Sequence, residues 1–348
     1  MKKILIIKPS SLGDIIHALP VATAISRQIS GVVIDWVVRP EYAEILQAHP
    51  AIRRIFFFDR GKWVRSSRML QTLPEIIGMV RSIRQEHYDA VLDLQGLFRS
   101  GLLSFLSGSK LRLGFENARE FSTVFYNRKV KVPNEGIHAI DRYQLFLREM
   151  GIASPKLDYG LILPGEAVGF VEKLLVEEGI RSVRPLIALN PNARWETKQW
   201  LPDRFAVLAD RLVDDLGAEV VFVGAASDGG WIQKILADVK KPVHNLAGKT
   251  TILQLAALLR KAALLVTCDS GPMHLAAAVG TKVLALFGPT DPVRTGPYGS
   301  ENRVIQKDMD CSPCLRRSCP ERTHLCMEAI TADEVFQEVK QMLTTILT

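Results

Sequence analysis

Residues 264–287, LLVTCDSGPMHLAAAVGTKVLALF, decide the fold of this chain. An apolar run ends at Cys268, a short polar turn follows, and an alanine-rich segment leads into a second apolar run. This order predicts a strand, a tight turn, a helix and another strand, which is the repeating unit of a parallel sheet covered by helices. Ser270 suits the helix cap, and Pro272 fits the first helical turn because its missing N–H would have no partner there.

The turn after Cys268 carries groups that can bind phosphate. Asp269, Ser270 and His274 lie around the start of the predicted helix. Where a parallel strand passes into a helix, free backbone N–H groups face an anion at the carboxyl edge of the sheet. We therefore expect a phosphate-bearing ligand at this turn. The alternative is an ordinary buried unit whose capping residues hold no ligand.

Short apolar runs alternate with amphipathic segments along the rest of the chain. In the first half, strands are expected at residues 4–7, 32–38, 55–58, 90–94 and 111–114, and helices at 15–28, 42–48, 74–87 and 100–106. In the second half, strands at 186–189 and 220–223 accompany helices at 202–216, 231–239, 252–261 and 332–347. This alternation predicts an α/β protein of two doubly wound domains, residues 1–160 and 161–348, that face each other across a ligand-binding cleft.

Composition and charge limit the classes of partner. The 348 residues carry a formal net charge of +7, which favours an anionic partner. Aromatic residues make up only 7% and no nucleic-acid-binding motif is present, so we expect no nucleic-acid partner. The sequence has no apolar run of about 18 residues and no signal peptide, so a cytoplasmic protein is expected. Basic residues gather around Arg60 and Lys62, either as a binding loop or as a solvated face.

The first predicted strand ends in a turn that holds a candidate general base. Ser10, Ser11, Gly13 and Asp14 separate this strand from the helix, without the glycine fingerprint of dinucleotide-binding oxidoreductases. Asp14 could be a helix cap, but Ser11 can serve in that role. An ionised carboxylate at the sheet edge is the group that accepts a proton from an attacking hydroxyl. His17, one turn later, would either orient Asp14 or pack in the core.

Two further turns carry charged groups at predicted strand ends. Arg194 and Lys198 follow the apolar run 186–189 and present cations suited to a diphosphate. Asp228 follows the run 220–223 and could accept hydrogen bonds from a ribose.

Four cysteines lie close together in the sequence, at Cys311, Cys314, Cys319 and Cys326. In a cytoplasmic chain such a cluster holds a metal ion more often than disulfides, but this spacing fits neither common paired zinc pattern. A structural metal, reduced packing cysteines and an incidental disulfide are all open alternatives. None of them would perform chemistry.

Several segments together resemble the bacterial lipopolysaccharide heptosyltransferases, glycosyltransferase family 9. They are KPSSLGDIIHALP at 8–20, ARWETKQW at 193–200 and DSGPMHLAAAVGTKVLALFGPTDP at 269–292. YDAVLDLQGLFRS at 88–100 and NAREFSTVFYNRKV at 117–130 are most similar to the members that add the first heptose to the Kdo residues on lipid A. The resemblance implies a GT-B fold and inverting transfer of L-glycero-D-manno-heptose from ADP-heptose, with no cofactor required.

The resemblance also implies roles for individual residues. Asp14 would deprotonate the acceptor hydroxyl, and a single base opposite the leaving group agrees with inversion. Lys198 would neutralise the departing diphosphate with help from His274. The donor-binding residues would be Arg194, Asp228, Thr250, Asp269, Ser270, Gly271, Pro272 and Met273. The acceptor-binding residues would be Ser10, Ser11, Gly13, His17, Arg60, Lys62 and Arg119.

The partners implied by the resemblance are ADP-heptose, Kdo-lipid A and the anionic inner leaflet. A peripheral protein on the inner face of the bacterial inner membrane is therefore expected. The alternatives are a family relative that uses another nucleotide sugar or a later core heptose as acceptor, and a non-catalytic protein that binds anionic glycans. The oligomeric state is left open.

Overall fold

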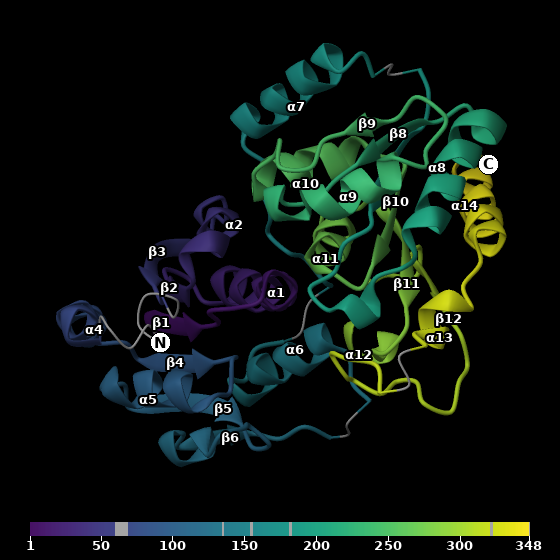
Figure 1. Cartoon of the computed structure of the whole chain (residues 1–348). Coiled ribbons are helices and arrows are strands. Elements are labelled where there is room, and N and C mark those ends of the chain that lie inside the picture. Colours follow the sequence, from purple (N-terminus) through teal and green to yellow (C-terminus); the bar gives the residue numbers. More distant parts are fainter. Residues whose placement is uncertain (60–68, 134–135, 154–155, 181–182, 321–322, 348) are drawn as a thin grey trace. The chain divides into compact units, whose positions relative to one another are not determined.

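The computed structural model describes residues 1–59, 69–133, 136–153, 156–180, 183–320 and 323–347. The chain divides into two compact units, Met1–Ile162 and Leu163–Thr348. Each unit contains a six-stranded parallel sheet flanked by helices (Figure 1). The α/β class and the two parallel sheets predicted from the sequence are confirmed.

The N-terminal unit has the strand order β3-β2-β1-β4-β5-β6. Its strands are β1 (Lys3–Ile7), β2 (Val33–Val38), β3 (Ile52–Phe57), β4 (Ala90–Asp93), β5 (Leu111–Phe115) and β6 (Arg128–Val130). Its helices are α1 (Leu12–Gln28), η1 (Pro40–Tyr42), α2 (Ala43–Gln47), α4 (Met69–Gln85), α5 (Phe98–Leu106), η3 (Ser122–Phe125) and α6 (Ala139–Glu149). Ile4 to Ile7 of β1 are fully buried because this strand pairs on both sides, with β2 and β4.

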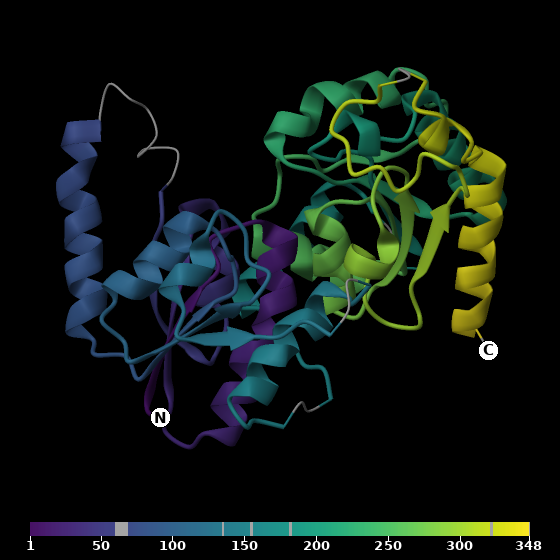
Figure 2. The ribbon, with the colours of Figure 1, turned by 90° about the horizontal axis from the view of Figure 1, so that it is seen from below.

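The C-terminal unit repeats this topology with the order β12-β11-β10-β7-β8-β9. Its strands are β7 (Leu186–Asn190), β8 (Glu219–Phe222), β9 (His244–Asn245), β10 (Leu264–Cys268), β11 (Lys282–Phe287) and β12 (Arg303–Gln306). Its helices are α7 (Gly165–Glu177), η4 (Glu196–Lys198), α8 (Pro202–Leu216), η5 (Ala226–Asp228), α9 (Gly229–Leu236), α10 (Ile252–Lys261), α11 (Gly271–Ala278), α12 (Pro292–Thr295), α13 (Leu325–Glu328) and α14 (Ala332–Leu347). The closing helix α14 packs beside α8 (Figure 1) and is the yellow helix that leads to the C-terminus in Figure 2.

The decisive stretch folds as predicted, into β10, α11 and β11. The helix expected at residues 42–48 is the short helix α2, which directly follows the 3-10 helix η1. Helices α6 and α7 and the edge strands β6, β9 and β12 lie outside the predicted elements. Edge strands are short and half exposed, so they carry little of the apolar signal on which a prediction depends. None of the described helices is long and apolar enough to cross a membrane.

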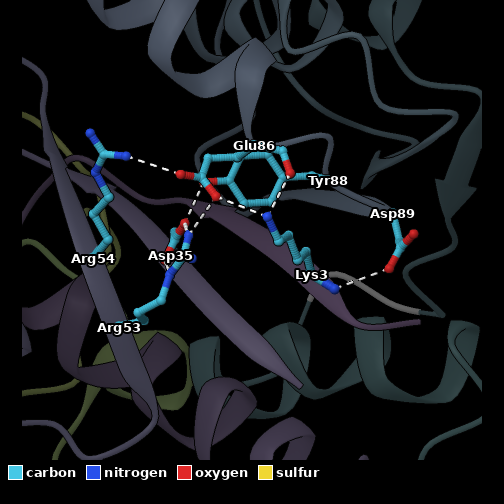
Figure 3. Close-up of polar contacts among 7 residues, drawn as sticks. All are labelled: Lys3, Asp35, Arg53, Arg54, Glu86, Tyr88 and Asp89. Carbon is cyan, nitrogen blue, oxygen red and sulfur yellow. Dashed lines mark hydrogen bonds and ion pairs between the residues drawn. The ribbon is translucent and has the colours of Figure 1, made fainter. Parts of the chain in front are cut away.

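A polar network ties the amino-terminal half of the first sheet together (Figure 3). Arg53 on β3 donates two hydrogen bonds to the fully buried carboxylate of Asp35 on β2, at 3.0 and 2.5 Å. The Tyr88 hydroxyl donates to the same carboxylate at 2.5 Å, and burial raises the pKa of this hydroxyl. Glu86 accepts from Arg53 and from Lys3 at the start of β1. A buried carboxylate needs such partners, so this network stabilises the sheet at the edge opposite the candidate site.

His49 joins three segments of the N-terminal unit. Its Nδ1 accepts from the Ala51 N–H at 3.2 Å, so the proton is on Nε2, which lies 3.0 Å from the Tyr159 carbonyl and 3.1 Å from the Thr23 hydroxyl. Gly160, at φ +63°, is required here because a Cβ would lie 2.4 Å from that hydroxyl oxygen. Burial lowers the pKa of His49 to about 4. The neutral ring thereby fixes residues 159–160 against α1.

Because of His49, we expect the protein to become less stable in acid. The pKa of His49 is depressed in the folded state. The neutral ring therefore contributes fully to the free energy of unfolding above pH 6.5, and this contribution is lost as the pH falls towards 4. Wild type should lose about 2–3 kcal/mol more over this interval than His49→Gln, which has no ionisable group. Urea unfolding between pH 4 and 7.5 measures the difference. His87→Asn, which replaces an exposed histidine, serves as the control; an equal acid loss in His49→Gln and wild type contradicts the prediction.

Candidate active site

Asp14 lies in the first turn of α1, at the carboxyl edge of the first sheet. One of its oxygens accepts hydrogen bonds from the N–H and the hydroxyl of Ser11, at 3.0 and 2.8 Å. Ser11 occupies the N-cap position, so Asp14 supplies the return bond of a capping box. The side chain is nevertheless 42% exposed. Asp14 therefore has a structural role and can still be reached by a substrate.

Lys8 and Tyr143 surround the other oxygen of Asp14. The Lys8 ammonium, only 3% exposed, lies 3.5 Å from this oxygen, and the Tyr143 hydroxyl donates to it at 3.3 Å. Burial lowers the pKa of Lys8, but the Asp14 carboxylate and the Tyr143 hydroxyl more than offset this effect, so the net pKa is raised. Burial also raises the pKa of Tyr143 to about 12. A protonated lysine and a tyrosine donor favour Asp14 as an anion.

Sequence reasoning assigned no role to Lys8 or Tyr143. Lys8 directly follows the first strand and begins the turn that leads to Asp14, so its position in the sequence could have indicated a role at this site. Tyr143 lies 129 residues from Asp14 in the chain, on α6, which packs against α1. Only the fold brings these two residues together.

The other predicted acceptor residues lie around the same sheet edge. His17 is 3% exposed and its ring meets that of His138 edge-on, with centroids 5.2 Å apart, so it packs in the interior. Ser10 is half-buried and Gly13 is buried. Arg119 is exposed in the loop after β5. Arg60 and Lys62 lie outside the described residues.

A buried aspartate at the end of β4 holds the loop that carries Arg119. Asp93 accepts from the Gly96 N–H at 3.1 Å and from the Tyr126 hydroxyl at 2.6 Å. The Gly96 carbonyl in turn accepts from the Arg119 N–H at 3.0 Å. Burial raises the pKa of Asp93, although these donors oppose the effect. The loops after β4 and β5 are therefore fixed to each other.

In the C-terminal unit, polar side chains from the ends of β7 and β10 hold the turn before α11. The Asn190 side chain at the end of β7 donates to the Ser270 hydroxyl at 2.9 Å and to the Thr267 hydroxyl at 3.3 Å. Ser270 occupies the N-cap position of α11 as predicted, but its side chain makes no capping bond to the helix. The Ser270 hydroxyl therefore does not occupy the backbone N–H groups at the start of α11.

Lys198 meets Asp269 at the same edge. The Lys198 ammonium lies 2.7 Å from the Asp269 carboxylate, which also accepts from the Thr290 hydroxyl at 2.7 Å. Asp269 is 7% exposed and the Lys198 side chain 16% exposed. An ammonium has three N–H donors, so the pairing with Asp269 leaves donors for a second anion. Thr290 was not among the predicted residues.

The Trp195 ring lies close to two cations, one in this loop and one in the cysteine-rich segment. The Lys198 ammonium is 4.4 Å and the Arg317 guanidinium 5.3 Å from the centre of the indole ring. The Thr197 hydroxyl donates to the Arg316 carbonyl at 2.9 Å, which ties the loop to the cysteine-rich segment. These contacts hold Lys198 in place beside Asp269.

The remaining predicted donor-binding residues differ in exposure and in the turns to which they belong. Asp228 accepts from the Ala225 N–H at 2.7 Å and pairs with Asn192, so its carboxylate already orders its own turn. Arg194 is exposed, and Thr250 is half-buried just before the cap of α10. Gly271 and Pro272 begin α11, followed by the buried Met273 and His274. Within this unit the fold gathers Lys198, Asp269 and Ser270, whereas Asp228 belongs to a separate turn after β8.

The cysteine-rich segment does not support a metal site. No group of three or more histidine, cysteine, aspartate or glutamate side chains within the described ranges could hold a metal ion. None of the five cysteines, all of which are described, forms a disulfide. Burial first, and then the nearby Cys311, Cys314 and Cys319, raise the pKa of Cys326. Cys311 is exposed and Cys314, Cys319 and Cys326 are half-buried.

Comparisons with known proteins agree on one family. Residues 76–324 match the profile of glycosyltransferase family 9 (heptosyltransferase). Lipopolysaccharide heptosyltransferase 1 of Pseudomonas aeruginosa is 32% identical over 329 residues, or 91% of this chain and 87% of that protein. The crystal structure of a family 9 glycosyl transferase from Veillonella parvula has a TM-score of 0.86 at 23% identity, over 99% of this chain and 98% of its own. E. coli heptosyltransferase WaaC with ADP-2-deoxy-2-fluoro heptose has a TM-score of 0.75 at 26% identity, over 97% of this chain and 99% of its own. The GT-B fold expected from the sequence is thereby confirmed.

Proposed function

Because the chain belongs to glycosyltransferase family 9, the heptosyltransferases, we propose that it transfers L-glycero-D-manno-heptose from ADP-heptose to a Kdo residue of the lipopolysaccharide inner core on lipid A. The similarity to a heptosyltransferase 1 over nine-tenths of the chain supports the acceptor. The ADP-heptose analogue held by a similar structure supports the donor. The observation that carries the catalytic proposal is the exposed Asp14 carboxylate between Lys8 and Ser11.

We propose that the donor binds at the carboxyl edge of the second sheet. The N–H groups at the start of α11 and the Lys198 ammonium suit a diphosphate, because both present positive charge. As the bond between the anomeric carbon and the diphosphate oxygen breaks, negative charge develops on the leaving ADP. A preorganised ammonium stabilises this charge more than it stabilises the bound ground state. Asp269 and Thr290 would serve to position Lys198.

We propose that Asp14 accepts the proton of the acceptor hydroxyl. The hydroxyl oxygen forms the new bond to the anomeric carbon from the face opposite ADP, which inverts the configuration. The proton passes to a lone pair of an Asp14 carboxylate oxygen, while Ser11 and Tyr143 hold that carboxylate in place. The exposed Arg119 would contact acidic groups of the acceptor. His274 would assist on the donor side.

We also propose that the protein acts at the inner face of the inner membrane. Its net charge of +7 favours approach to an anionic surface. The acceptor is anchored in lipid, so transfer would require at least transient contact between the enzyme and that surface.

A direct assay tests this function. The protein is incubated with ADP-heptose and Kdo-bearing lipid A, and the product is analysed by mass spectrometry. We expect the acceptor to gain one heptose, with the anomeric configuration inverted relative to the donor. Parallel reactions contain other nucleotide sugars or a core that already carries the first heptose. If transfer occurs only in one of the parallel reactions, the proposed donor or acceptor is wrong. If no reaction shows transfer, the proposal that the protein is a glycosyltransferase acting on these substrates is contradicted.

The buried Lys8 should set the pH range of Asp14. In Lys8→Met the carboxylate loses the cation that stabilises its ionised form. We expect the acid limb of the kcat/KM profile to move to higher pH by about one unit or more, with the rate at alkaline pH largely kept. Tyr143→Phe, which removes one neutral donor, should move the limb less. An unchanged acid limb in Lys8→Met would show that Asp14 does not control this ionisation.

A further inference from the structure

Helix α5 and the 3-10 helix η3, which pack against each other, each expose large apolar side chains. Phe98 and Phe105 of α5 are 45% and 53% exposed, and Phe121 and Val124 are 85% and 72% exposed. The two elements are in contact through Phe125, whose ring centre lies 5.3 Å from that of Phe98 and 6.1 Å from that of Phe105. These five side chains define the α5–η3 face.

The packing beneath the α5–η3 face is close. A Cβ at Gly101 would lie 2.8 Å from the Phe125 ring and 3.1 Å from the Ser122 side chain, so glycine is needed for η3 to approach α5. Ser122 is fully buried and its hydroxyl donates to the Arg119 carbonyl at 2.8 Å. The exposed side chains are therefore held in place by well-packed neighbours. Exposed apolar side chains gathered on neighbouring elements are a feature of interaction sites.

The surrounding segment is strongly basic. Residues 97–131 contain seven basic and two acidic side chains: Arg99, Lys110, Arg112, Arg119, Arg128, Lys129 and Lys131 against Glu116 and Glu120. All seven basic side chains except the half-buried Arg112 are exposed, and Arg128 is paired with Glu149 at 3.1 Å. The Arg112 guanidinium lies 5.5 Å from the centre of the Phe105 ring and donates to the Phe125 carbonyl at 2.9 Å. Positive charge thus accompanies the aromatic side chains.

The α5–η3 face begins at the sheet edge that carries Asp14. Phe98 lies in the first turn of α5, which follows β4. Strand β4 pairs with β1, and β1 leads into the turn before Asp14. Arg119, two residues before Phe121, is fixed to the loop after β4 by its N–H bond to Gly96. A surface that contacts α5 and η3 would therefore lie next to this edge.

We propose that the α5–η3 face docks on an anionic lipid bilayer. Aromatic side chains enter the interface between headgroups and acyl chains, and the basic side chains contact lipid phosphates. The combination of exposed aromatic groups with an excess of positive charge favours this occupant over a second copy of the chain, which would bring like charges together. The proposal rests on the proposed function, since it brings the edge with Asp14 to a lipid-anchored acceptor.

The test compares two pairs of exposed substitutions. Phe121→Asn with Val124→Ser changes the α5–η3 face, and asparagine tolerates the φ of +57° at residue 121. Val176→Ser with Val293→Ser replaces side chains that are 78% and 62% exposed in the C-terminal unit and serves as the matched control. Each full-length protein is sedimented with vesicles of phosphatidylcholine alone or mixed with phosphatidylglycerol. Light scattering gives the oligomeric state, and transfer to a deacylated, water-soluble Kdo acceptor gives the activity without lipid.

We expect wild type and the control pair to bind the anionic vesicles, and the α5–η3 pair to bind them at least about tenfold more weakly. Activity on the water-soluble acceptor should be equal in all three proteins. Equal vesicle binding by the α5–η3 pair and wild type would overturn the proposal, as would a dimer that this pair dissociates without loss of vesicle binding. If none of the proteins transfers heptose but vesicle binding changes as expected, the proposed function fails and the docking surface stands.

Discussion

Replacing Asp14 by asparagine is expected to lower the rate of heptosyl transfer about 10²- to 10⁴-fold while leaving the affinity for ADP unchanged. Asparagine has nearly the same shape, and its amide oxygen can still accept from the Ser11 N–H that Asp14 binds at 3.0 Å. The amide cannot accept the proton of an attacking hydroxyl. The loss should therefore appear in kcat rather than in donor binding. Single-turnover transfer and calorimetric titration with ADP measure the two quantities.

Two controls separate the chemistry from the fold. Asp203→Asn removes an exposed first-turn carboxylate from α8 and should leave transfer unchanged. Asp14→Asn leaves the buried Lys8 beside a neutral group, so its unfolding must be measured and compared with Asp14→Asn combined with Lys8→Met. If both Asp14 variants are folded and inactive, the lost group is the base. A folded Asp14→Asn protein that transfers at the wild-type rate would show that Asp14 is only a cap.

Replacing Lys198 by methionine is expected to lower kcat about 10²- to 10³-fold. The ammonium is held by Asp269 and by the face of Trp195, so it is preorganised before the diphosphate leaves. Methionine keeps much of the apolar length of the side chain but offers no charge to the departing ADP. The Michaelis constant for the donor should rise less than kcat falls, because the charge on the leaving group is largest in the transition state.

A second variant is needed because Lys198 is paired with the buried Asp269. Lys198→Met leaves the Asp269 carboxylate, 7% exposed, without its cation, which by itself destabilises a protein. Lys198→Met combined with Asp269→Asn removes both charges and should restore stability without restoring transfer. Lys261→Met, which breaks a surface pair with Glu172, is the matched control and should be fully active. Recovery of transfer in the double variant would assign Lys198 a structural role only.

The sequence predicted the repeating pattern of the fold because that pattern is local. The apolar runs before Asp14 and Asp269 became the central strands β1 and β10, whose neighbours on both sides demand apolar residues. The turn at Ser270 was predicted from capping preferences and was found at the N-cap of α11. The edge strand β12, with the sequence RVIQ, contains only two apolar residues and gave no comparable signal.

The detailed contacts of the candidate site could not be predicted in the same way. Asp14 and Asp269 were named from their turns, but their partners Tyr143 and Thr290 lie 129 and 21 positions away in the chain. Ser270 was expected to cap its helix, whereas its hydroxyl pairs with Asn190, a residue 80 positions away. Such long-range polar pairs depend on the register of several strands, which a single sequence does not specify.

The central claim is that Asp14 and Lys198 act on one sugar carbon. It is tested most directly by a crystal structure of the Asp14→Asn variant with a non-transferable ADP-heptose analogue and a Kdo acceptor. We predict the side chain of residue 14 within about 2.6–3.2 Å of the attacking hydroxyl and the Lys198 ammonium beside the diphosphate on the opposite face of the heptose. A hydroxyl held by another carboxylate, with residue 14 out of reach of the sugar, would contradict the claim.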